Sequence, residues 1–360
     1  MSAPVRSGEQ AARALRSLYR SCGYQPFRVQ KFERYELYAE NKRFLTTEKV
    51  LTFTNTDGRL MAMKPDVTLS IVQEPQTAGL RKVYYHENVY REQRPGEGFR
   101  EIPQTGLECI GALDACAVGE VVMLAARSLE TIRESWALAV SHIGVVSGVL
   151  EAADAAPETQ KAVFAAMGAK NAAALRQLCP NETGDTLASL AGLSGEPEEI
   201  IARAQALSLP ENSRAALNEL AETAAQLRLY GLGGVKLDFS VVNDPEYYDN
   251  IVFRGYVEGA PGSVLSGGRY DRLLARMGRP GGAIGFAVYL DRLDDARAAR
   301  PDYDFDTLVC FAADEDAPLA ILTAERLRAE GETVRVERTA PAGLRFKRVL
   351  RAEKGAVTPC

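Results

Sequence analysis

Two strand-like runs joined by a loop rich in proline and glycine constrain the fold of this chain most. RKVYYHENVYRE (81–92) and EIPQTGLECIGA (101–112) flank the connection QRPGEGF (93–99), which is the pattern of a hairpin. A shorter pair of runs precedes it around Asp57-Gly58, and VKLDFSVV, NIVFRGYVE and GSVLSGGRY follow later. Hairpins join antiparallel strands, so we expect a mainly antiparallel sheet.

Helical patterns surround these strands. Residues 8–21 carry apolar side chains at helical spacing and end before Gly23, and residues 119–138 are also predicted to be helical. From about 150 to 229 the chain is rich in alanine and is broken only by prolines. This block is acidic, so it is predicted to be a helical packing insertion rather than a surface for a phosphate backbone.

The sequence beyond Pro301 has a different pattern. DTLVCFA, PLAILTAERLRAEG, TVRVE and LRFKRVLRAEKG predict a strand, a helix, a strand and a basic helix, in that order. Only AVTPC follows, so the unit is short for an independent α/β domain. We therefore expect residues 1–148 and 231–298 to form one core in two parts, 149–230 to form an insertion, and 304–360 to form a C-terminal α/β remnant.

Composition excludes several classes of function. The net charge of -5 gives no general reason to expect nucleic acid or an anionic membrane as a partner. Six scattered cysteines and two histidines, His86 and His142, predict reduced thiols and no multi-histidine metal site. Without a secretory signal or a stretch of membrane-spanning length, the protein is predicted to be cytoplasmic, with no metal or cofactor.

Polar residues at even spacing give a candidate site. Gln104 and Glu108 are four residues apart on a predicted strand, and Asp66 and Thr68 are two apart, so each pair would share a face. Such a group of acceptors could surround an ammonium group. The same spacing also fits the solvated face of a sheet, and both interpretations remain open on spacing alone. Arginines beside the Pro-Gly-rich loop could clamp a carboxylate or phosphate: Arg91, Arg94 and Arg100.

Several separate motifs resemble one family. VYYHENVYREQRPGEGFREIPQTGLECIG resembles the second signature motif of class II aminoacyl-tRNA synthetases of the histidyl type. SGGRYDRLLARMG and GGAIGFAVYLDRL resemble that family's glycine-rich tyrosine segment and third motif, and AMKPDVTLSIVQ is similar to the stretch that meets the substrate amino group. The resemblance implies an α+β fold: a class II aminoacyl-tRNA synthetase-like antiparallel sheet flanked by helices, with a helical insertion and a short, incomplete C-terminal α/β unit.

The resemblance also implies a pocket for free histidine. Carried over by position, its residues are Asp66, Thr68, Arg91, Gln104, Glu108, Tyr248 and Tyr270. Asp66 stands where the family has a glutamate, so its carboxylate would reach less far toward the ammonium group.

The nucleotide side departs from the synthetase pattern. Asn243 occupies the place of a histidine-specific arginine, Gln93 replaces a glutamate and Tyr289 replaces a small residue, whereas Arg292 is retained. Loss of one donor that stabilises developing charge costs a factor of roughly 100 to 1,000 in rate. These positions are therefore interpreted as a vestigial nucleotide site, with the Tyr289 phenol in the space where the family holds ATP.

Two groups of proteins share such a core: histidyl-tRNA synthetases and regulatory subunits of ATP phosphoribosyltransferase. The departures favour the second, a non-catalytic subunit that would bind the short-form catalytic subunit and free histidine and mediate feedback control of histidine biosynthesis. A homodimer within a larger hetero-oligomer is implied, and tRNA binding is not expected because the C-terminal unit is incomplete. The alternatives are a histidine-tRNA ligase with a divergent active site and a free-standing histidine or RNA sensor.

Overall fold

The computed structural model describes residues 8–45, 49–74, 79–92, 96–242, 247–297 and 303–360. The chain divides into two compact units, Met1–Ala296 and Arg297–Cys360, and each is described by itself. No helix in these described ranges combines the length and the apolar character needed to cross a bilayer.

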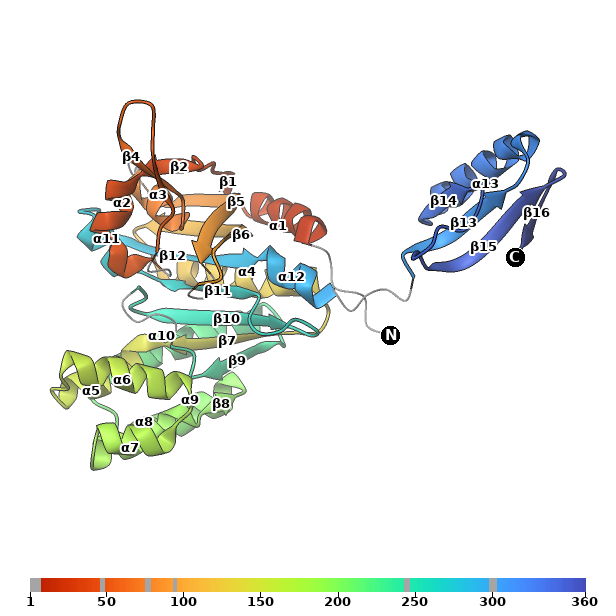
Figure 1. Ribbon diagram of the computed structural model, residues 1–360. Helices are drawn as coiled ribbons and strands as arrows, with labels where there is room; N and C mark the ends of the chain where they lie inside the picture. The colour runs from red at the N-terminus through yellow and green to blue at the C-terminus, as the bar shows by residue number, and fades with distance from the viewer. Residues whose placement is uncertain (1–7, 46–48, 75–78, 93–95, 243–246, 298–302) are drawn as a thin grey trace. The chain divides into compact units, whose positions relative to one another are not determined.

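A nine-stranded sheet organises the described part of the first unit, in the order β1-β5-β6-β12-β11-β10-β7-β9-β8 (Figure 1). Its strands in chain order are β1 (Gln25–Pro26), β5 (Arg81–Glu92), β6 (Phe99–Gly111), β7 (Trp136–His142), β8 (Ser194–Gly195), β9 (Val235–Asp238), β10 (Ile251–Val257), β11 (Leu265–Arg269) and β12 (Gly282–Tyr289). All neighbours are antiparallel except β1 with β5 and β7 with β9. The predicted α+β class with a mainly antiparallel sheet is confirmed.

The long predicted hairpin is the pair β5 and β6. Its register runs from Arg81 opposite Ile110 to Glu92 opposite Phe99. Directly opposite residues point to the same side of a sheet, so odd-numbered residues of β5 share a face with even-numbered residues of β6. This alternation decides which side chains meet in the site.

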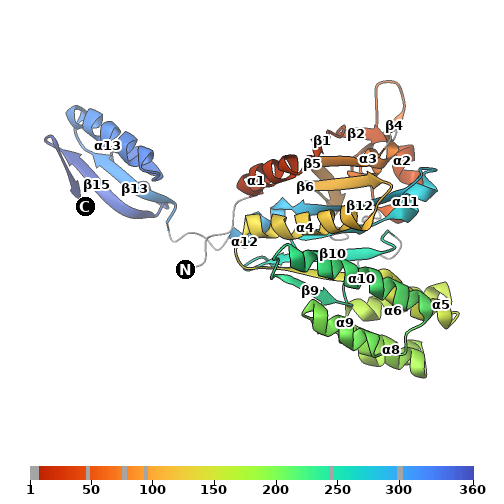
Figure 2. The same cartoon turned by 180° about the vertical axis from the view of Figure 1, so that it is seen from behind.

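The two faces of the sheet carry different helices. On one face α1 (Gly8–Ser21) and α4 (Ala115–Ile132) pack against Leu107 of β6 and Phe286 of β12. On the other face α2 (Tyr35–Glu40), α3 (Thr68–Gln73) and α11 (Asp271–Arg276) form a second core with Tyr85 of β5. Figures 1 and 2 show these two faces from opposite sides.

Apolar spacing and a capping side chain account for two of the helices on the first face, α1 and α4. α1 buries Ala11, Leu15 and Tyr19 at helical spacing, and Asp114 caps α4 by accepting a hydrogen bond from the Ala117 amide.

A small antiparallel sheet lies beside α2 and contains β2 (Phe32–Arg34), β3 (Thr52–Thr54) and β4 (Leu60–Met63). Its β3–β4 hairpin is the one predicted at Asp57-Gly58.

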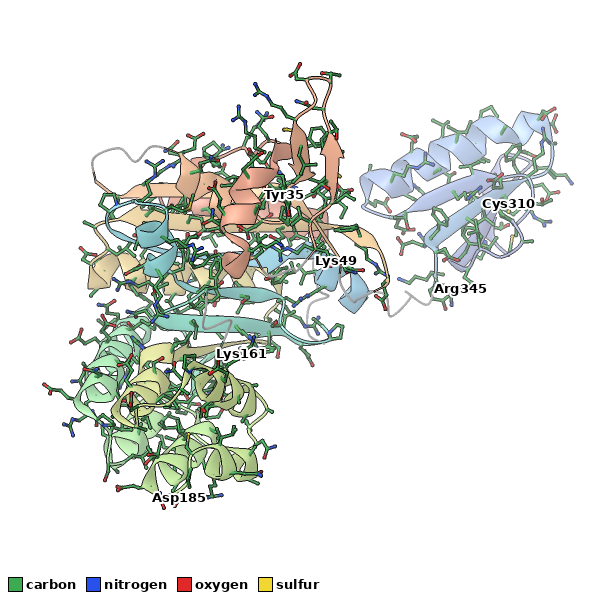
Figure 3. The ribbon with its side chains drawn as sticks, turned by 60° about the vertical axis from the view of Figure 1, so that its left-hand side comes forward. Tyr35, Lys49, Lys161, Asp185, Cys310 and Arg345 are labelled. Atoms are coloured by element: carbon green, nitrogen blue, oxygen red, sulfur yellow. The ribbon has the colours of Figure 1, made fainter. Side chains whose placement is uncertain are left out.

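The predicted insertion is helical. Its elements are α5 (Ile143–Ala152), α6 (Pro157–Gly168), α7 (Ala172–Leu178), α8 (Glu182–Ala191), α9 (Pro197–Gln205) and α10 (Glu211–Leu229), and the short strand β8 joins the main sheet. Lys161 on α6 and Asp185 on α8 are exposed on this insertion (Figure 3). The helix α12 (Leu290–Arg297) follows β12.

The described residues of the second unit form a four-stranded sheet in the order β14-β13-β15-β16. Its elements are β13 (Phe305–Phe311), α13 (Ala317–Ala329), β14 (Val334–Glu337), β15 (Phe346–Glu353) and β16 (Ala356–Pro359). Cys310 lies on β13 and Arg345 directly precedes β15 (Figure 3).

The prediction of a basic helix at the C-terminus is wrong, because this segment is the strand β15. Lys347 and Arg351 are exposed, whereas Ala352 is buried and Leu350 packs against the small core under α13. Lys354 and Gly355 both have positive φ, 52° and 78°, which forms a tight turn back into β16. The predicted β-α-β-α order is therefore β-α-β-β-β.

Candidate functional site

A cavity of about 200 Å³ opens on the face of the large sheet that packs against α3 and α11. All seven residues predicted for the histidine pocket line it: Asp66, Thr68, Arg91, Gln104, Glu108, Tyr248 and Tyr270. Val67, Tyr85, Tyr247, Arg254, Ser266, Gly285, Phe286, Ala287 and Tyr289 complete its wall. The structure thus brings the predicted pocket residues together.

Strand register places the strand residues of the cavity. Glu108 lies opposite Gly285 and Gln104 lies opposite Tyr289 in the pairing of β6 with β12. Arg254 of β10 lies opposite Ser266 of β11. All of these residues line the cavity. Residues four apart on a strand share a face, so the prediction that Gln104 and Glu108 point to the same side is confirmed.

The prediction that Asp66 and Thr68 lie on a strand is wrong. Thr68 begins the helix α3, and the Asp66 carboxylate accepts a hydrogen bond from the Leu69 amide at 2.9 Å. Such a hydrogen bond from a nearby backbone amide to a side chain stabilises a local turn and competes with strand pairing. Both side chains reach the cavity from a helix start rather than from a strand.

Glu108 is the central polar group of the cavity. The Thr68 hydroxyl donates to Oε1 at 2.8 Å and the Tyr270 hydroxyl donates to Oε2 at 2.5 Å. Burial, opposed by these two hydrogen bonds, raises the pKa of Glu108 to about 8. Burial favours the neutral carboxyl and the two hydroxyl donors favour the carboxylate, and the effect of burial is the larger.

Gly285 makes room for this carboxyl group. A Cβ atom built on Gly285 would lie 1.6 Å from Glu108 Oε2, far inside van der Waals contact. The glycine opposite Glu108 is thus a steric requirement of the site.

Asp66 and Arg91 form a second polar pair. Arg91 Nη2 lies 3.5 Å from Asp66 Oδ2 and Arg91 Nε donates to the Pro65 carbonyl at 2.5 Å. Burial raises the pKa of Asp66, and the Arg91 guanidinium opposes that rise. Two buried carboxyl groups, Asp66 and Glu108, therefore share one cavity with a guanidinium at its side.

Gln104 offers a donor with no partner. Its side chain is buried, and among the described residues its Nε2 has no hydrogen-bond acceptor. An unmatched buried donor costs free energy unless something accepts from it. A ligand acceptor in the cavity would satisfy it.

Tyrosine rings wall the cavity. The Tyr247 ring centroid lies 4.6 Å from that of Tyr248 and 5.4 Å from that of Tyr270. Burial raises the pKa of all three phenols well above the usual range, so they act as neutral donors and flat apolar surfaces. Sequence reasoning did not place Tyr85 or Ser266 here, although the period-two alternation of β5 and β11 would have indicated them.

Tyr289 lines the cavity, whereas Arg292 is not among its lining residues and packs on the Tyr289 ring. The Arg292 guanidinium carbon is 4.3 Å from the Tyr289 ring centroid, a cation–π distance. Arg292 also donates to the Ser263 carbonyl and, at 3.3 Å, to the Ser263 hydroxyl. That Tyr289 fills a former nucleotide site stays a prediction, and Gln93 and Asn243 lie outside the described residues.

The structure describes two of the three arginines predicted to form a clamp. Arg91 lines the cavity, Arg100 does not, and Arg94 lies outside the described residues. The described residues contain no cluster of His, Cys, Asp or Glu suited to a metal ion. His142 is structural, because it caps α5 and lies 2.9 Å from the Glu219 carboxylate.

Comparisons with known proteins match most of this chain. The histidyl-tRNA synthetase family model matches residues 3–293. The ATP phosphoribosyltransferase regulatory subunit of Anaeromyxobacter dehalogenans strain 2CP-1 is 34% identical over 77% of this chain and 83% of its own. That of Symbiobacterium thermophilum is 31% identical over 90% of this chain and 85% of its own.

Solved structures show the same fold. An ATP phosphoribosyltransferase regulatory subunit/histidyl-tRNA synthetase from Bacillus halodurans matches with a TM-score of 0.74 and 25% identity, covering 96% of this chain and 93% of the other. The ATP phosphoribosyl transferase (HisG:HisZ) complex from Thermotoga maritima contains a chain that matches with a TM-score of 0.62 and 18% identity, covering 79% and 97%. The chain belongs to the family of histidyl-tRNA synthetase-like proteins that comprises the regulatory subunits of ATP phosphoribosyltransferase.

Proposed function

We propose that this protein is the regulatory subunit of an ATP phosphoribosyltransferase and that it binds free histidine in the cavity around Glu108. The curated relatives carry the name of that subunit, and the Thermotoga maritima structure holds such a subunit in complex with HisG. By this proposal the partner is the short-form catalytic subunit, and histidine biases the complex toward an inhibited state.

The charges of the cavity suit an amino acid. Asp66 and Glu108 together can offset an ammonium group, while Arg91 lies beside them and Arg254 lines the same wall. Carboxylate recognition by guanidinium groups is a common arrangement. The cavity therefore offers acidic groups to the ammonium and basic groups to the carboxylate of an amino acid.

The walls suit a small aromatic ring. A cavity of about 150 Å³ holds a benzene-sized molecule, and this one measures about 200 Å³. Tyr247 and Tyr248 supply flat surfaces, and the unpartnered Gln104 amide supplies a donor to a ring nitrogen or carboxylate. The buried Glu108, held by two hydroxyl donors, carries the proposal.

Calorimetry with histidine tests the pocket. Thr68→Val removes one donor to Glu108 and is expected to weaken histidine binding about tenfold, since a hydrogen bond to a charged group contributes roughly 1.5–3 kcal/mol. Thr131→Val is the matched control, because the Thr131 hydroxyl donates to a carbonyl of its own helix, α4. Failure of the unaltered protein to bind histidine at millimolar concentration would overturn the pocket assignment.

Two further measurements test the class of function. Co-expression with a short-form catalytic subunit is expected to yield a stable complex. Pyrophosphate exchange with histidine and ATP is expected to be absent, and robust exchange would instead identify a histidine-tRNA ligase.

A further inference from the structure

Arg254 lies on a strand that otherwise carries no charge. β10 has the sequence IVFRGYV, and it lies inside the large sheet between β11 and β7 (Figure 1). Phe253 and Gly255 are buried, whereas Arg254 is partly exposed and lines the cavity around Glu108. A charged group in the middle of a sheet costs free energy unless an opposite charge compensates it. The place of Arg254 at the cavity therefore points to a function.

The residues that flank Arg254 across the sheet are small. Ala139 of β7 and Ser266 of β11 lie opposite it on the two neighbouring strands. Ser266 lies opposite Ala287 of β12, and Ala287 lies opposite Gly106 of β6. Opposite residues point to the same side of a sheet, so a row of short side chains runs from Arg254 toward β6. This row leaves the cavity open beside the long arginine side chain.

The acidic groups of the cavity lie at a distance from β10. Glu108 belongs to β6, which β12 and β11 separate from β10, and Asp66 lies just before α3. Neighbouring strands are about 4.8 Å apart, so β6 and β10 are about 14 Å apart. An amino acid carries its ammonium and carboxylate groups on one carbon atom. A ligand between the two sides can therefore present the ammonium group to the acidic residues and the carboxylate to Arg254.

Arg91 also lines the cavity, but it is held beside an acidic residue. Its Nη2 lies 3.5 Å from Asp66 Oδ2, and its Nε donates to the Pro65 carbonyl at 2.5 Å. A ligand carboxylate placed against Arg91 would lie close to the Asp66 carboxylate, and like charges in a buried site repel each other. The wall that carries Arg254 is the better place for the ligand carboxylate.

We propose that Arg254 binds the carboxylate of the histidine ligand and makes the pocket selective for the amino acid over the corresponding alcohol. A guanidinium group pairs with both oxygens of a carboxylate, whereas a hydroxyl offers it one weaker contact. Ser266, opposite Arg254, adds a hydroxyl to the same wall. This inference rests on the proposed function, because it assigns one group of bound histidine to one residue of the cavity.

Calorimetry with histidine and with histidinol tests the assignment, since histidinol has a hydroxyl group in place of the carboxylate. The unaltered protein is expected to bind histidine at least about tenfold more tightly than histidinol, as one charge-assisted hydrogen bond requires. Arg254→Gln is expected to weaken histidine binding by at least about tenfold and to leave the affinity for histidinol unchanged. Arg203→Gln, at an exposed ion pair with Glu199 on α9, is the control and is expected to change neither affinity.

Two further variants sharpen the test. Arg254→Lys keeps the positive charge but loses the planar fork of donors, so it is expected to bind histidine with an intermediate affinity. It takes the place of Arg254→Gln if urea unfolding shows that the glutamine variant does not fold. If Arg91→Gln, and not Arg254→Gln, removes the preference for histidine over histidinol, the carboxylate lies at Arg91 and the inference is wrong.

The remaining outcomes separate this inference from the proposed function. Equal losses of both ligands in Arg254→Gln would mean that Arg254 supports the shape of the pocket, and equal affinities of the unaltered protein for both ligands would mean that the carboxylate is not recognised. Either result overturns the inference while histidine still binds. Absence of histidine binding to the unaltered protein would overturn the proposed pocket and the inference with it.

Discussion

Replacing Glu108 by glutamine tests the electrostatics of the proposed histidine pocket. The carboxyl has an ordinary pKa of 4.5 and a pKa of about 8 in the folded protein. The folded state therefore keeps a proton that the unfolded state releases at lower pH. The contribution of Glu108 to stability is lost as pH rises from 4.5 toward 8.

The size of the effect follows from that interval. Each pH step between the two pKa values weakens the folded state by about 1.4 kcal/mol, so the cost reaches about 3 kcal/mol at pH 7. Glutamine does not titrate. We compare the free energy of unfolding of Glu108→Gln with that of the unaltered protein. The difference, variant minus unaltered protein, is expected to increase by about 1.4 kcal/mol per pH unit between pH 5 and pH 8.

Urea unfolding at a series of pH values measures this difference. The amide can accept from only one of the two hydroxyl donors, Thr68 or Tyr270, which adds a constant offset. The slope with pH is therefore the informative quantity. A difference that stays flat from pH 5 to pH 8 would show that Glu108 ionises normally and would refute the account of its environment.

Three other changes have specific expected outcomes. Because an ammonium ligand requires ionised Glu108, histidine affinity should rise with pH between about 6 and 8 in calorimetry, and an affinity independent of pH would contradict this. Gly285→Ala places a methyl group against Glu108 and should lower the free energy of unfolding by about 1–3 kcal/mol in urea titrations, with loss of histidine binding. Unchanged stability would argue against the close approach. Tyr289→Ala should open the side of the pocket and permit weak binding of an ATP analogue in equilibrium dialysis; no gain would mean that the phenol is not the barrier.

Periodicity predicted much of the fold and site. Gln104 and Glu108 were placed correctly because a strand directs residues four apart to the same side, whatever surrounds it. The helical insertion was also predictable, since a long alanine-rich run has few alternatives to helix. The resemblance to histidyl-tRNA synthetases supplied Tyr248 and Tyr270, which no local pattern connects with Glu108.

The errors arose where long-range pairing decides the local structure. Phe346–Glu353 carries basic residues at spacings that also fit a helix, but parallel pairing with β13 and the turn at Lys354-Gly355 make it a strand. Thr68 begins a helix although the spacing of Asp66 and Thr68 suggested a strand.

Histidine inhibition of the reconstituted ATP phosphoribosyltransferase tests the central claim most directly. Phosphoribosyl transfer is measured against histidine concentration with the unaltered subunit, with Thr68→Val and with the control Thr131→Val. The account predicts that Thr68→Val shifts the inhibition curve about tenfold to higher histidine, while Thr131→Val leaves it in place and activity without histidine is the same in all three. Unchanged inhibition with Thr68→Val would place the histidine sensor elsewhere and contradict the account.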